Sequence, residues 1–133
     1  MIVDTRRIDM KKLELAIEEV QKAKNVCWDA VLEEMKDFLT GKEGAKLVFT
    51  GYTPSFNDGD ACEFTFCVNE DDYADWENSA LADICWEFAD QLTCMAVVED
   101  LFQHKYGVEG FKLTYTLKEG ELSLNEEDYY CGY

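Results

Sequence analysis

The sequence has one histidine, His104, one proline, Pro54, and no basic residue between Lys46 and Lys105. Histidine is the commonest partner of a catalytic nucleophile. The nearest cysteine, Cys94, is ten residues from His104, or about 15 Å along one helix, which is too far for a dyad. Glycine patterns that bind nucleotide phosphates are also lacking. We therefore expect no catalytic residues and a protein that is not an enzyme.

The six cysteines include no pair separated by two residues, which together with the single histidine argues against a zinc site. We expect no metal site and no cofactor. The N-terminus lacks the apolar segment of a secretion signal, and no apolar run approaches the roughly 18 residues of a membrane span. These features predict a cytoplasmic protein with free thiols that does not bind membranes.

Acidic residues dominate the chain, with 29 acids against 12 basic residues and a net charge of −17. Residues 1–44 hold eight basic and ten acidic residues, whereas residues 45–133 hold four lysines and nineteen acids, a net of −15. Such a surface repels nucleic acid and attracts basic protein surfaces. The alternative is that the charge serves only solubility.

Residues 9–40 have the apolar spacing of one helix, about 48 Å long. Asp9 is a candidate N-cap and Gly41 a candidate C-terminal stop. Such a helix is long for a small domain, so either it breaks near Lys24 or it extends past the body and packs on something else. A second copy of the chain is the simplest partner, which predicts a homodimer. The expected contacts are Val20, Cys27, Val31 and Met35.

The rest of the chain predicts two hairpins separated by a second helix. Alternating patterns predict strands at 45–52, 62–69, 111–117 and 121–125, with a two-residue turn at Glu119-Gly120. Asn78 or Ser79 can cap the second helix, with an earlier start near Asp71 as the alternative, and Gly107 supplies its C-terminal stop. We expect one α+β domain over residues 1–133 with the order α-β-β-α-β-β. Both helices pack on one face of a four-stranded antiparallel sheet, and residues 1–8 and 126–133 form flexible ends.

Carboxylates and aromatic residues alternate in the segment EDDYADWENS (70–79) and continue into the second helix. Carboxylates at intervals with aromatic anchors can compete for a basic groove that normally holds phosphates. The alternative is a solvated acidic face with buried aromatics. The predicted partner-binding residues are Asp71, Asp72, Asp75, Trp76, Glu77, Asp83, Glu87 and Asp90.

The stretch GYTPSFNDGD (51–60) is the strongest turn signal in the chain. It predicts an ordered hairpin connection, a partner-facing loop or a divalent-cation site that uses Asn57, Asp58, Asp60 and Glu63. The EF-hand pattern fails here, because glycine and the final glutamate are not at the required positions. The residues singled out in this loop are Tyr52, Pro54, Phe56, Asn57, Asp58, Gly59 and Asp60.

Residues 51–64 also resemble a YTPxFNDGxxCxF stretch of small uncharacterised acidic proteins of tailed bacteriophages. The match is carried by Tyr52, Pro54, Phe56, Asn57, Asp58, Gly59, Cys62 and Phe64. The resemblance implies no catalytic residues; it implies a phage context and the host cytoplasm, where small acidic proteins often inhibit host proteins. The expected function is therefore an acidic, non-catalytic protein-binding module that blocks a basic nucleic-acid-binding surface of a host protein. Self-association through the N-terminal helix and a cation-binding loop are the alternatives.

Overall fold

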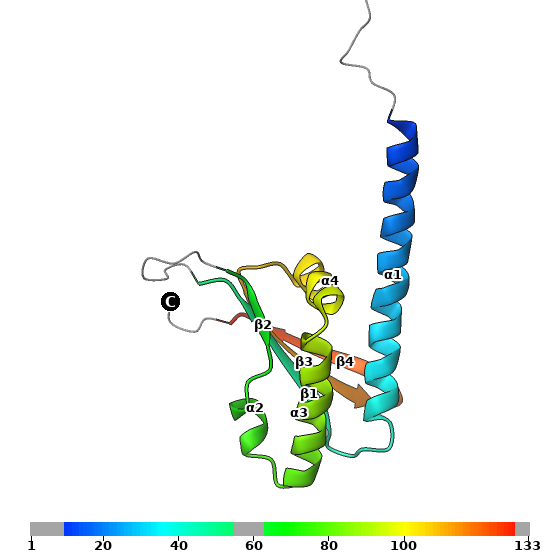
Figure 1. The fold of residues 1–133 in the computed structure, drawn as a ribbon. Helices are drawn as coiled ribbons and strands as arrows, with labels where there is room; N and C mark the ends of the chain where they lie inside the picture. Colours follow the sequence, from blue (N-terminus) through cyan, green and yellow to red (C-terminus); the bar gives the residue numbers. More distant parts are fainter. Residues whose placement is uncertain (1–9, 55–62, 130–133) are drawn as a thin grey trace, which may run out of the picture.

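The computed structural model describes residues 10–54 and 63–129. Its helices and strands build a four-stranded antiparallel sheet in the order β2-β1-β3-β4, with α1, α3 and α4 in front of it in the view of Figure 1. The α+β class and the single antiparallel sheet are therefore confirmed. The elements are α1 (Lys11–Leu39), β1 (Lys46–Tyr52), β2 (Thr65–Cys67), α2 (Asp71–Ala74), α3 (Ser79–Thr93), α4 (Ala96–Tyr106), β3 (Gly110–Lys118) and β4 (Glu121–Glu127).

The sheet follows the predicted alternation most clearly in β3. Phe111, Leu113 and Tyr115 are buried, and the residues between them are only half-buried. The β3–β4 turn is the predicted two-residue turn, with φ of 52° at Glu119 and 79° at Gly120. Positive φ at both positions matches the right-handed twist of the two strands. β2 is only three residues long, shorter than the predicted strand.

The N-terminal helix α1 is unbroken at Lys24, so of the two alternatives the structure shows the helix that extends past the body (Figure 1). That the extension packs on a second copy stays a prediction. Every side chain from Met10 to Cys27 is exposed, and packing of α1 against the hydrophobic core begins at Trp28. Two expected dimer contacts, Val31 and Met35, are instead buried in the molecule's own core. They were misassigned because the sequence does not show where along the helix the body begins.

The second predicted helix is two helices, α3 and α4, with a break at Cys94 and Met95. Met95 has extended backbone (φ −92°, ψ 116°), and the chain turns there so that α4 lies across the end of α3 (Figure 1). A straight helix through both segments would run about 42 Å. The break lets Phe102 return to the sheet, where its ring centroid lies 5.3 Å from that of Phe49 and 4.8 Å from that of Phe66.

Candidate functional site

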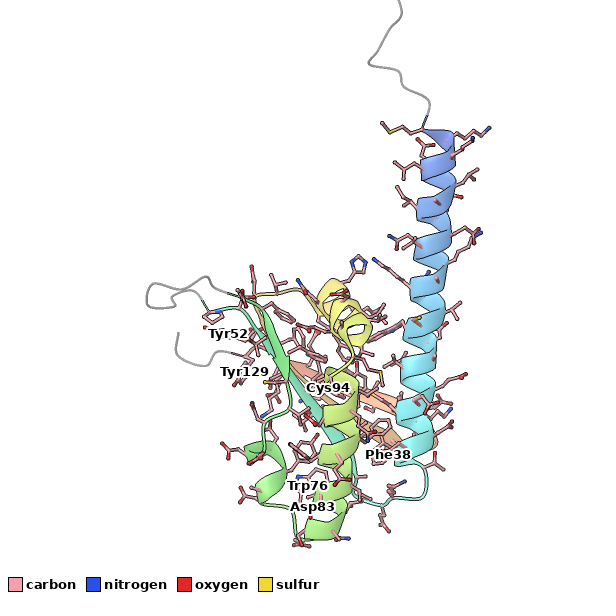
Figure 2. The ribbon with its side chains drawn as sticks, viewed as in Figure 1. Phe38, Tyr52, Trp76, Asp83, Cys94 and Tyr129 are labelled. Atoms are coloured by element: carbon pink, nitrogen blue, oxygen red, sulfur yellow. The ribbon has the colours of Figure 1, made fainter. Side chains whose placement is uncertain are left out.

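The helices α2 and α3 and the turn between them carry exposed carboxylates. We call this surface the acidic face; it consists of Asp71, Asp75, Glu77, Asp83 and Glu87, all exposed. The half-buried Asp90 extends the acidic face along α3. Figure 2 shows Asp83 near the N-terminal end of this helix. Because the sequence has no basic residue from 47 to 104, no lysine or arginine of these helices neutralises the surface.

The sequence of α3 explains why its acids share a side. Asn78 caps the helix, its Oδ1 accepting a hydrogen bond of 3.1 Å from the backbone N–H of Leu81. Asp83, Glu87 and Asp90 are four and three residues apart, which aligns them along one side of a helix. The opposite side consists of small buried residues: Ala82, Cys85 and Ala89.

A groove of about 450 Å³ lies between α2 and α3. Carboxylates of Glu70, Asp83 and Glu87 line it together with the rings of Tyr73 and Trp86. The Nε1 of Trp86 is buried and has no hydrogen-bond partner within the described ranges. Carboxylates beside an indole ring suit the charged end of an arginine or lysine side chain.

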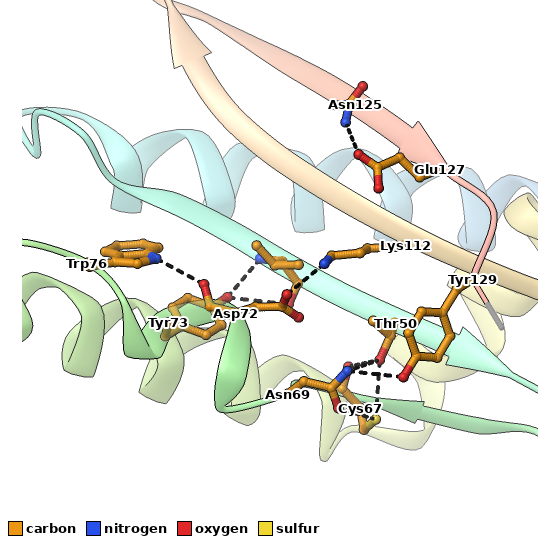
Figure 3. Close-up of polar contacts among 11 residues, drawn as sticks. Thr50, Cys67, Asn69, Asp72, Tyr73, Trp76, Lys112, Asn125, Glu127 and Tyr129 are labelled. Atoms are coloured by element: carbon orange, nitrogen blue, oxygen red, sulfur yellow. Dashed lines mark hydrogen bonds and ion pairs between the residues drawn. The ribbon is translucent and has the colours of Figure 1, made fainter. Parts of the chain in front are cut away.

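Tyr73 fixes the groove to the sheet. Its hydroxyl accepts a hydrogen bond of 2.7 Å from the N–H of Val48 and donates to the carbonyl of Val48 at 3.3 Å. These are edge groups of β1 beyond the end of β2, so a side chain completes the edge where no strand pairs (Figure 3). Burial raises the pKa of Tyr73 well above its usual value, which keeps the donating proton in place.

Two predicted partner-binding residues have partners inside the molecule instead. The Oδ1 of Asp72 accepts a hydrogen bond of 2.7 Å from the Nζ of Lys112 in β3, and this carboxylate raises the pKa of the lysine (Figure 3). Trp76 donates from Nε1 to the carbonyl of Asp72 at 2.9 Å, and Lys46 lies over its ring. Asp72 and Trp76 both hold α2 against the sheet. We therefore do not include them in the acidic face.

Sequence reasoning missed the groove between α2 and α3. Glu70, Tyr73 and Trp86 are all outside the predicted set of partner-binding residues. Glu70 and Asp83 are far apart in the sequence, and nothing in that separation indicates that both residues line one groove. Only the turn between α2 and α3 brings them together.

The residues singled out in the loop are only partly described. Tyr52 is buried at the end of β1, with its ring 5.9 Å from that of Tyr129, and Pro54 is half-buried. The other five, Phe56, Asn57, Asp58, Gly59 and Asp60, lie outside the described residues. The cation-site hypothesis at 57–63 therefore stays a prediction.

The described part of the chain offers neither a metal cluster nor a membrane span. No three of its His, Cys, Asp or Glu side chains are grouped so that they could hold a metal ion. None of its helices combines the length and apolar character needed to cross a bilayer. Cys27, Cys67, Cys85 and Cys94 are free thiols.

The sequence matches no family model and no curated protein, and the structure matches no solved structure.

Proposed function

We propose that the protein is a non-catalytic binding module whose acidic face contacts a basic surface of another protein. The observation that carries the proposal is the acidic face itself: five exposed carboxylates, of which Asp83 and Glu87 line a groove that also presents Trp86. Exposed carboxylates create a negative electrostatic potential at the surface, and this potential steers a positively charged partner toward it.

The partner we propose is a protein that normally binds nucleic acid. A basic nucleic-acid-binding surface is selected to hold closely spaced negative charges, and the carboxylates of α3 repeat along one side of the helix. Asp83, Glu87 and Asp90 are spaced by about 6 and 4.5 Å of helix rise. Together with the phage resemblance of residues 51–64, this supports an inhibitor that displaces nucleic acid from a host protein.

The test is capture from bacterial lysate on immobilised protein, elution with a salt gradient, and identification by mass spectrometry. We expect a basic nucleic-acid-binding protein that elutes at a defined salt step and that double-stranded DNA releases. Asp83→Asn with Glu87→Gln removes two charges of the acidic face. Its affinity for the captured protein should fall roughly 5- to 30-fold, because each exposed ion pair contributes up to about 1 kcal/mol.

The matched control is Asp100→Asn with Glu109→Gln, two exposed acids outside α2 and α3. Both double variants change the net charge from −17 to −15. Equal losses of affinity in the two variants would mean that net charge alone attracts the partner. Binding that is unaffected by salt, or a captured protein that DNA does not release, would contradict the proposal.

A further inference from the structure

Residues 10–27, the N-cap and the first 17 of the 29 residues of α1, extend away from the hydrophobic core, and we call them the arm. One side of the arm carries Met10, Leu13, Ile17 and Val20, which are 50, 55, 49 and 52% exposed. We call these four residues the apolar stripe. Figure 1 shows the arm rising past α4. Only the last part of the arm lies beside α4, where Gln21, Lys24 and Asn25 line a groove with residues of that helix.

The apolar stripe continues the side of α1 that faces the body. From Met10 its spacing alternates between three and four residues through Lys24 and Cys27 to the buried Val31. This is the heptad spacing of a helix that packs along another helix. From Trp28 onward, this side of α1 packs against the core of its own molecule, whereas in the arm the same side stays exposed.

A helix of this length gains little stability from its backbone alone. Isolated helices of 12 to 15 residues are marginal in water, and most helical stability comes from packing an amphipathic face. Four large apolar side chains in a row on an exposed helix are typical of an interaction surface. The arm is also nearly neutral, with four lysines and three glutamates, so the acidity of the rest of the chain does not oppose pairing between arms.

We propose that the arm pairs with the arm of a second copy of the chain, and that the two helices run antiparallel. The heptad spacing sets the register: Ile17 lies beside Val20 of the second copy, and Met10 lies beside its Cys27. A two-fold axis then passes between residues 18 and 19, and each pair occurs twice. The contact is about 27 Å long, the length of the 18-residue arm.

The position of the body favours antiparallel over parallel pairing. From Trp28 onward the body occupies the same side of α1 that the apolar stripe occupies in the arm. In a parallel pair the two bodies would lie at the same end of the paired helices, and both would occupy the space between them. They would also bring together two regions of net charge −15, whereas an antiparallel pair places them at opposite ends.

The arm is complementary to itself in this register. Lys24 interrupts the apolar spacing, and in the antiparallel pair it lies next to Glu14 of the second copy. Ala16 and Ala23 flank the stripe, and their small side chains permit close approach of the helices. A parallel pair would instead set Lys24 against Lys24, a like-charge contact.

A groove at the base of the arm gives the end of the second helix a place to pack. It has a volume of about 290 Å³ and is lined mainly by Ala30, Val31, Phe88, Leu92, Met95 and Val98. Helical side chains lean toward the N-terminus of their own helix. Met10 of the second copy, at the level of Cys27, therefore points toward this groove.

Cysteine cross-linking tests the register directly. In a chain with Cys62, Cys94 and Cys131 replaced by serine, Met10→Cys adds a partner for Cys27. Residues 10 and 27 of one helix are about 25 Å apart, so a disulfide between them forms only between two copies. We expect mild oxidation to give a covalent dimer linked 10 to 27, identified by mass spectrometry of the linked peptides. Links of 27 to 27 would overturn the antiparallel arrangement.

Sedimentation equilibrium tests the surface with a matched pair of variants. Ile17→Glu with Val20→Glu places charge in the apolar stripe and should raise the dimer Kd at least about 100-fold. Leu15→Glu with Val26→Glu makes the same change at 54 and 68% exposed residues on the opposite side of the arm, and its Kd should stay within about threefold.

All four positions are exposed, and circular dichroism should show that both variants keep the folded body. A wild-type chain that stays monomeric up to about millimolar concentration would overturn the proposal. Equal Kd values for the two double variants would overturn it as well. The acidic face takes no part in this contact, so binding of a basic partner can fail while the dimer persists, and the reverse.

Discussion

Three consecutive residues of α2 show how strongly position decides the role of a side chain. Asp71 is exposed, Asp72 is paired with Lys112, and Tyr73 is buried against the edge of β1. The two aspartates are equivalent in sequence terms, since both lie in the same acidic segment. They differ because α2 turns one toward solvent and the other toward β3.

Asp72→Asn should destabilise the protein by about 1–2 kcal/mol, because it leaves the half-buried Lys112 without its carboxylate. The side chains of Asp72 and Lys112 are 16 and 32% exposed, so water compensates for part of the lost interaction. Urea denaturation with an unchanged m-value would measure this loss.

Asp71→Asn is the control, and it should change the free energy of unfolding by less than about 0.5 kcal/mol. If Asp72→Asn left stability unchanged and weakened binding of a basic partner, Asp72 would belong to the acidic face. The structure assigns it to the support of α2 instead.

At the scale of elements, the hairpin β3–β4 and the break between α3 and α4 were predictable to different degrees. The turn at Glu119-Gly120 depends on two adjacent residues, and its φ values match the expected turn. The break at Met95 depends on where Phe102 must pack, which no local pattern encodes. Ile84 and Met95 fit the apolar spacing of a single helix, yet both are exposed.

The turn makes a prediction of its own. Glu119 adopts a left-handed conformation that costs an ordinary L-residue about 1–2 kcal/mol, and asparagine tolerates it better. Glu119→Asn creates Asn-Gly, the preferred pair for this turn. We expect stabilisation of about 0.5–1 kcal/mol in thermal or urea denaturation. Destabilisation would mean that the two positive φ values do not describe the turn in solution.

At the scale of the whole molecule, charge divides the chain into two regions. The arm is nearly neutral, whereas residues 45–133 carry a net charge of −15. The ion pairs that the described residues make are few, and only the one between Asp72 and Lys112 is short. We therefore expect repulsion among carboxylates to outweigh local pairing.

This balance predicts that salt stabilises the protein. Raising sodium chloride from about 10 to 300 mM shortens the Debye length and screens the repulsion among carboxylates. The Tm in differential scanning calorimetry should rise by several degrees. The same measurement on Ile17→Glu with Val20→Glu, the variant with the disrupted apolar stripe, separates this effect from dimerisation. A Tm that falls with salt would show that attractive pairs dominate instead.

The sequence by itself determined the features that depend on neighbouring residues. It indicated the α+β class, the alternation of β3, a cap at Asn78 or Ser79, the β3–β4 turn and the acidity of residues 45–133. Periodicity also indicated a helix too long for its body. Each of these follows from local backbone preference or from side-chain spacing, which are properties of short segments.

Only the tertiary structure decided which of those residues face solvent. It placed Val31 and Met35 in the core and left the apolar stripe of the arm exposed. It paired Asp72 with Lys112, 40 residues away, and it brought Glu70 and Asp83 to one groove. Burial depends on contacts between distant segments, and a side chain's type and its neighbours in sequence leave those contacts open.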